Sequence, residues 1–128
     1  MRHLTAEQAL AYFRLGKTLE QWLGTRVVGS DRVLRWVVVQ RQSDGDYLVT
    51  LFEGFENERA AHSLYNIYSL ELDQDGARQP VDETPKEFVL PSEEAVVDFV
   101  EDRLGGSRER FVNEGLAQDD YVASLAMP

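Results

Sequence analysis

No cysteine occurs among the 128 residues of the chain, so disulfides, thiolate zinc sites and cysteine nucleophiles are excluded. Long apolar runs are missing as well, since none approaches the roughly 20 residues that a membrane-spanning helix requires. The N-terminal residues lack the basic and then apolar layout of a signal peptide. We therefore expect a cytoplasmic protein that contacts no membrane.

Residue patterns that carry common enzymatic chemistry are also scarce. The chain contains two histidines, His3 and His62, and no Gly-x-Ser-x-Gly turn that would present a serine nucleophile. The glycines at positions 45, 54 and 76 are isolated, so neither a phosphate-binding loop nor a dinucleotide fingerprint is present. We expect no enzymatic activity and no cofactor.

One segment brings together oxygen and nitrogen groups of the kind that bind divalent metals: Glu53, Glu56, Glu58 and His62. The segment is polar and contains Gly54, a composition more typical of a solvated loop. The sequence therefore predicts an exposed loop after residue 52 and no metal site.

Charge is distributed unevenly along the chain. Residues 1–64 contain 8 basic and 8 acidic side chains, whereas residues 65–128 contain 5 basic and 15 acidic ones, which accounts for the whole net charge of −10. An acidic surface attracts basic partners over long distances and repels phosphate backbones. Although Arg26, Arg32, Arg35 and Arg41 flank the segment around Trp36, the net charge opposes nucleic acid as a partner. The alternative explanation of the acidic half is solubility alone.

The strongest structural signal lies in residues 32–55, where two strand-like segments flank a turn. Two apolar sets alternate along the first segment: Leu34, Trp36 and Val38 on one side, and Val33, Val37 and Val39 on the other. The second segment has the same two-sided pattern, and residues 43–46 contain the Asp-Gly pair of tight hairpin turns. The sequence predicts a β-hairpin that is covered on both faces.

A helix is predicted before the hairpin and another after it. Thr5 and Gln8 have the spacing of a capping box before an apolar stripe, which predicts a helix over residues 6–15 that ends at Gly16. The apolar stripe changes sides at Gly16, so residues 18–24 are predicted to form a second, short helical turn. Ser92 is the predicted N-cap of a helix that runs to Leu104.

Three further segments are assigned from weaker patterns. Alternation predicts a strand over residues 64–72, and residues 86–90 form a candidate fourth strand after a loop. A last short helix is expected between residues 107 and 115. Residues 117–128 are expected to form a weakly ordered tail unless Tyr121 and Leu125 dock on the domain.

Together these elements predict one α+β domain over residues 1–128. It comprises an N-terminal helix or helix pair, an antiparallel meander of three or four strands, and a C-terminal amphipathic helix packed on the sheet. On that helix Val96, Val97, Phe99, Val100 and Leu104 form an apolar stripe, and the opposite side carries Glu93, Glu94, Asp98, Glu101 and Asp102.

Size, charge and the absence of catalytic motifs favour a small acidic protein-binding module. Bacterial immunity proteins, which neutralise basic nuclease toxins by masking their surface, are the class that fits by analogy. The predicted contact is the acidic helix face, Glu94, Asp98, Glu101 and Asp102, with the segment Glu53, Glu56, Glu58 and His62 as a second contact.

Two other classes of function remain open from the sequence. One is a small-molecule-binding domain or enzyme with a pocket lined by Trp22, Trp36 and Tyr65. The other is a homodimeric adaptor or structural protein that pairs through a sheet edge.

Overall fold

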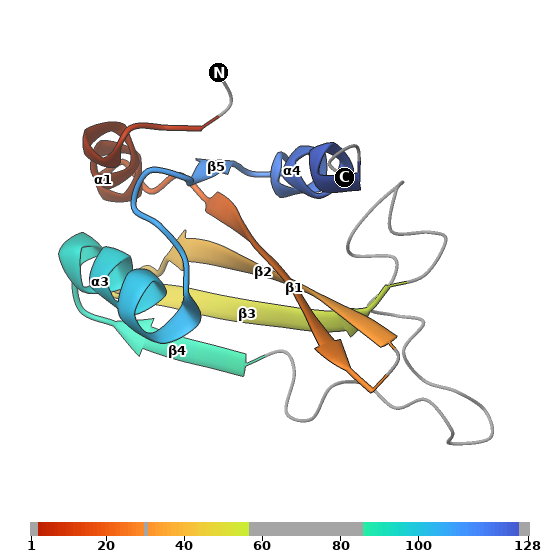
Figure 1. Ribbon diagram of the computed structural model, residues 1–128. Coiled ribbons are helices and arrows are strands. Elements are labelled where there is room, and N and C mark those ends of the chain that lie inside the picture. Colours follow the sequence, from red (N-terminus) through yellow and green to blue (C-terminus); the bar gives the residue numbers. More distant parts are fainter. Residues whose placement is uncertain (1–2, 30, 57–85, 126–128) are drawn as a thin grey trace.

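The computed structural model describes residues 3–29, 31–56 and 86–125, in which helices pack on both faces of one sheet (Figure 1). The elements are α1 (Ala6–Arg14), β1 (Leu19–Val28), β2 (Asp31–Arg41), β3 (Tyr47–Phe55), β4 (Lys86–Leu90), α3 (Glu93–Leu104), β5 (Val112–Asn113) and α4 (Ala117–Leu125). The five strands lie in the order β4-β3-β2-β1-β5, and each pairs antiparallel with its neighbour. The predicted α+β class is confirmed.

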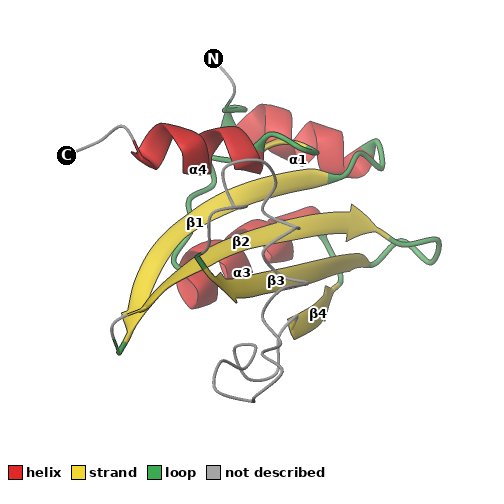
Figure 2. Cartoon of the chain, turned by 90° about the vertical axis from the view of Figure 1, so that its right-hand side faces the viewer, coloured by secondary structure: helices red, strands yellow, loops and turns green. Residues whose placement is uncertain are grey.

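Helices α1 and α3 lie on one face of the sheet and α4 lies on the other (Figure 2). This three-layer arrangement explains why the central strands are apolar on both sides. Among the described residues, no helix is both long and apolar enough to cross a membrane.

The hairpin of β2 and β3 forms as the sequence predicts. Trp36 pairs with Phe52 and Val38 with Thr50 across the two strands. The turn is closed by a 2.7 Å hydrogen bond from the Gln42 amide to the Asp46 carbonyl, and Gly45 adopts a φ of 93°, which glycine tolerates without strain.

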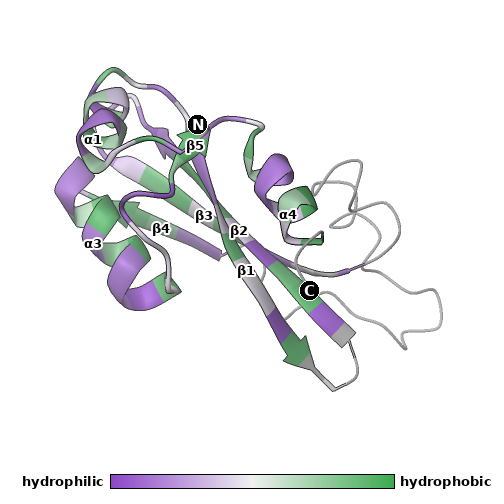
Figure 3. Cartoon of the chain, turned by 45° about the horizontal axis from the view of Figure 1, so that its top comes forward, coloured by the Kyte–Doolittle hydropathy of each residue, from purple (hydrophilic) through white to green (hydrophobic). Residues whose placement is uncertain are grey.

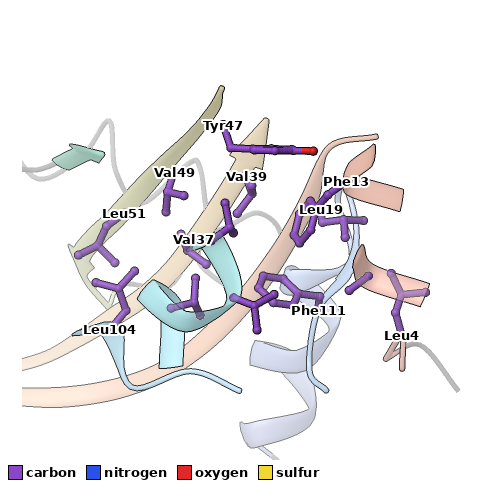
Figure 4. Close-up of a cluster of buried hydrophobic side chains, with 14 residues drawn as sticks. Leu4, Phe13, Leu19, Val37, Val39, Tyr47, Val49, Leu51, Leu104 and Phe111 are labelled. Atoms are coloured by element: carbon purple, nitrogen blue, oxygen red, sulfur yellow. The ribbon is translucent and has the colours of Figure 1, made fainter. Parts of the chain in front are cut away.

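The larger core lies between the sheet and the pair α1 and α3. Phe13 is its centre, because its ring meets the edges of Tyr47 and Phe111 at centroid distances of 5.9 and 5.3 Å. Figure 4 shows this first core, which is made of Leu4, Ala9, Phe13, Leu19, Val37, Val39, Tyr47, Val49, Leu51, Val96, Val97, Val100, Leu104 and Phe111.

A second core fills the opposite face of the sheet beneath α4. It comprises Trp22, Leu34, Trp36, Val38, Val112, Ala117 and Tyr121. The Trp36 side chain is wholly buried and stacks on Phe52 with ring centroids 5.3 Å apart. The two apolar sets predicted for β2 therefore face two different cores, Leu34, Trp36 and Val38 the second, and Val37 and Val39 the first.

The helical turn predicted for residues 18–24 is wrong, because these residues begin β1. Their apolar side chains switch faces because a strand alternates: Leu19 enters the first core and Trp22 the second. The polar residues between them, Glu20 and Gln21, are also buried, because distant parts of the chain satisfy their hydrogen bonds. Gln21 exchanges two hydrogen bonds with the backbone of Ser107, and Glu20 accepts one from the Ala117 amide.

The short helix predicted between residues 107 and 115 is also wrong. Val112 and Asn113 form β5, which pairs with Glu20 and Leu19 at the start of β1. Residues 117–125 form helix α4 rather than a loose tail. Tyr121 docks and is buried, whereas Leu125 is 46% exposed.

Most of the remaining predicted elements form as expected, and two lie outside the described residues. The capping box of Thr5 and Gln8, the Ser92 cap and strand β4 are confirmed. Helix α1 ends at Arg14 with Leu15 as its C-cap, one residue before the predicted cap Gly16, which follows with a φ of 81°. The predicted strand over 64–72 and the loop after it lie outside the described residues.

Candidate functional site

Helix α3 presents the acidic face that the sequence predicts. The Ser92 hydroxyl accepts a hydrogen bond from the Ala95 amide, and the helix ends at Gly105 with a φ of 76°. Val96, Val97, Val100 and Leu104 are buried, and Phe99 is half-buried. The hydrophilic outer side of α3 is visible in Figure 3.

Three carboxylates at four-residue spacing form one exposed stripe along α3: Glu94, Asp98 and Asp102. The side chains of Glu94 and Asp98 are 60% and 65% exposed. Asp102 is exposed and has no ion pair among the described residues. We call this set the α3 acidic stripe.

Arginines from outside the helix pair with the carboxylates at both ends of α3. Arg14 of α1 contacts Glu93 and Glu94, and Arg108 contacts Glu101 at 2.6 Å and Asp98 at 3.3 Å. The hydrogen bond from Arg14 lowers the pKa of Glu93, and that from Arg108 lowers the pKa of Glu101.

Glu101 has a structural role besides its charge. It also accepts a hydrogen bond from the Arg108 backbone amide at 2.8 Å, so it anchors the loop that follows α3. Of the four predicted helix contacts, Glu101 is the least available to a partner, because its side chain is only 27% exposed and Arg108 binds it at 2.6 Å. Glu94 and Asp98 make longer contacts of 3.3 Å with Arg14 and Arg108 and remain largely exposed.

The predicted exposed loop after residue 52 is wrong for its first residues, which extend β3. Glu53 is 5% exposed and receives a 2.8 Å bond from Arg35 Nε, with Arg26 Nη2 at 3.5 Å. The loop expectation failed because Arg35, on the neighbouring strand, stands opposite Glu53 and makes a charged residue compatible with burial.

Glu56 lies on the other side of the sheet, against α4. Its carboxylate accepts a 2.8 Å hydrogen bond from the Tyr121 hydroxyl and forms an ion pair with Arg32 at 3.4 Å. Because Glu53 and Glu56 contact opposite layers, they do not converge on one metal position. Across residues 3–29, 31–56 and 86–125 no group of three or more potential ligands gathers. Glu58 and His62 lie outside the described residues.

The Tyr121 hydroxyl should ionise with a pKa of about 12, above its usual 10. Burial is the larger cause, and the hydrogen bond to Glu56 adds to it. Since the folded-state pKa is the higher one, the contribution of Tyr121 to stability is complete below pH 10 and is lost as pH rises toward 12. Absorbance titration of wild type minus Tyr121→Phe isolates this ionisation, and a difference curve centred near 10 would contradict the packing of α4.

Two of the three aromatic residues predicted to line a pocket lie among the described residues, and both are tryptophans. Trp36 is wholly buried and Trp22 is 7% exposed, and both belong to the second core. Tyr65 lies outside the described residues. The two tryptophans are core residues.

A cluster of basic side chains surrounds Glu53, and the sequence does not predict it. Arg26, Arg35, Lys86 and Arg103 come from four different elements and line one cavity with Glu53. The one residue that could have indicated this cluster from the sequence is Arg35, because it is charged and lies on the otherwise apolar face of Val33, Val37 and Val39.

Comparisons with protein families, characterised proteins and solved structures found no match to this chain. The assignment of function therefore rests on the surfaces described above.

Proposed function

We propose that the protein is a small acidic binding module that occupies a basic surface of another protein, in the manner of an immunity protein that masks a nuclease toxin. The observation that carries this proposal is the α3 acidic stripe. Its carboxylates lie on the solvent side of a helix whose opposite side is fixed in the first core. The net charge of −10 acts in the same direction, because it steers a basic partner toward the domain.

The stripe is a preorganised surface. Helix α3 is capped at both ends, and Arg14 and Arg108 link it to α1 and to the following loop. A partner that binds here orders little backbone, so less of the interaction free energy is lost to conformational entropy.

Charge reversal at Asp98 and Asp102 tests the proposal. The partner is first captured from source lysate at low salt, released at high salt and assayed for nuclease activity. Reversal of both residues to lysine should slow association with that partner by on the order of tenfold or more at low salt. It should also abolish inhibition at concentrations where wild type inhibits. The measurement is association rate against ionic strength.

A control variant separates this face from the effect of overall charge. Glu7→Lys with Glu114→Lys changes the net charge by the same amount at exposed positions away from the stripe. Both double variants should unfold within about 1 kcal/mol of wild type, because exposed pairs contribute little. Equal association rates and salt slopes for the two double variants would refute binding through α3.

A further inference from the structure

A cavity of about 430 Å³ opens between the sheet and the C-terminal half of α3. Its apolar lining comes from Leu51 of β3, Phe88 of β4, and Phe99 and Leu104 of α3. The rings of Phe88 and Phe99 lie 4.7 Å apart at their centroids. The volume lies in the range of sites for small organic molecules.

The charged lining of the cavity is opposite in sign to the protein as a whole. Four cations, Arg26, Arg35, Lys86 and Arg103, surround a single carboxylate, Glu53. In a chain with 23 acidic and 13 basic residues, such an excess of basic side chains in one cavity is a local reversal. It is the arrangement that attracts and focuses an anion.

The five charges have different roles. Arg35 is held in place, because its Nε donates to Glu53 at 2.8 Å and its Nη1 reaches the Leu104 carbonyl at 3.5 Å. Lys86 and Arg103 have no ion-pair partner among residues 3–29, 31–56 and 86–125. The pair of Arg35 and Glu53 therefore forms a fixed part of the cavity wall, and Lys86 and Arg103 carry charges that form no ion pair within the described part of the chain.

From this combination we propose that the cavity binds a small organic anion, a molecule that carries one carboxylate or phosphate group on an aromatic or aliphatic body. Lys86 and Arg103 contact the anionic group, and Arg26 adds to the positive field. The apolar body lies against Phe88, Phe99 and Leu51. This site is separate from the α3 acidic stripe, which lies on the solvent side of the same helix.

Binding of three related probes tests the site: 2-naphthoate, 2-naphthyl phosphate and the neutral 2-naphthamide. Wild-type protein should bind at least one of the two anions, and the backbone N–H chemical shifts should then change around residues 51–53 and 86–88. It should bind 2-naphthamide at least about tenfold more weakly than that anion. The naphthoate and naphthyl phosphate results then identify the preferred anionic group.

Lys86→Gln with Arg103→Gln removes the two cavity charges that pair with no described residue, and it leaves the Arg35 and Glu53 pair intact. This variant should lose about tenfold or more in affinity for the two anions and little in affinity for 2-naphthamide. Lys17→Gln with Arg110→Gln, which removes two exposed charges away from the cavity, should bind as wild type does. The proposal is overturned if wild type binds neither anion, if the amide binds equally well, or if both double variants behave alike.

Discussion

Replacing Trp36 by alanine should lower the free energy of unfolding by about 3–5 kcal/mol, the range for large buried aromatic residues. Trp36 is wholly buried at the centre of the second core, where it stacks on Phe52 and pairs across the sheet with Trp22. Loss of its side chain leaves a void between the sheet and α4, and the surrounding strands are held too firmly to fill it.

Urea denaturation measures this effect. Leu15→Ala is the control, because Leu15 is 72% exposed and its truncation should change stability by no more than about 0.5 kcal/mol. A loss below about 1 kcal/mol for Trp36→Ala would contradict the burial of Trp36 in the second core.

Phe111→Ala should have a comparable cost, again about 3–5 kcal/mol, but in the first core. The Phe111 ring is wholly buried and meets Phe13 edge to face, with an interplanar angle of 84°. The Phe111 carbonyl also accepts a 2.8 Å hydrogen bond from the Leu4 amide, so this position ties the N-terminal segment to the end of the chain.

Asn113→Ala in β5, which begins directly after Phe111, provides a control, since Asn113 is exposed and its neighbour Val112 stays in place. Denaturation of both variants separates loss of the Phe111 core contact from the effect of truncating a side chain in this segment. If the two substitutions destabilise equally, the contribution comes from the strand and the Phe111 ring adds nothing to the core.

Elements with a strong local pattern were predictable from the sequence. The hairpin of β2 and β3 has a two-sided apolar alternation and an Asp-Gly turn, and α3 has a cap, a stripe and a terminal glycine. Each of these signals lies within a few residues of the element it defines, so no tertiary information was needed.

Elements defined by distant contacts were not predictable in the same way. Residues 19–24 look helical in isolation, and their burial as a strand depends on partners near residues 107 and 117. The two-residue strand β5 exists only because β1 offers an unpaired edge. Glu53 looks like a loop residue until Arg35 is placed beside it.

The same distinction between local patterns and distant contacts applies to the candidate sites. The α3 acidic stripe follows from helical periodicity, so Glu94, Asp98 and Asp102 could be placed on one exposed face from the sequence alone. The basic cavity brings together Arg26, Arg35, Lys86 and Arg103 from across the sheet and α3, and no spacing in the sequence marks that convergence.

Phe111, just before β5, supplies its side chain to the first core, and Val112, the first residue of β5, supplies its side chain to the second. Both cores are therefore completed from the last fifth of the chain. During synthesis on the ribosome, β1, β2 and β3 emerge long before these residues, with two apolar faces exposed and a strand edge unpaired. The nascent chain must remain soluble in that state, and the two cores are completed only after residues 111–121 have emerged.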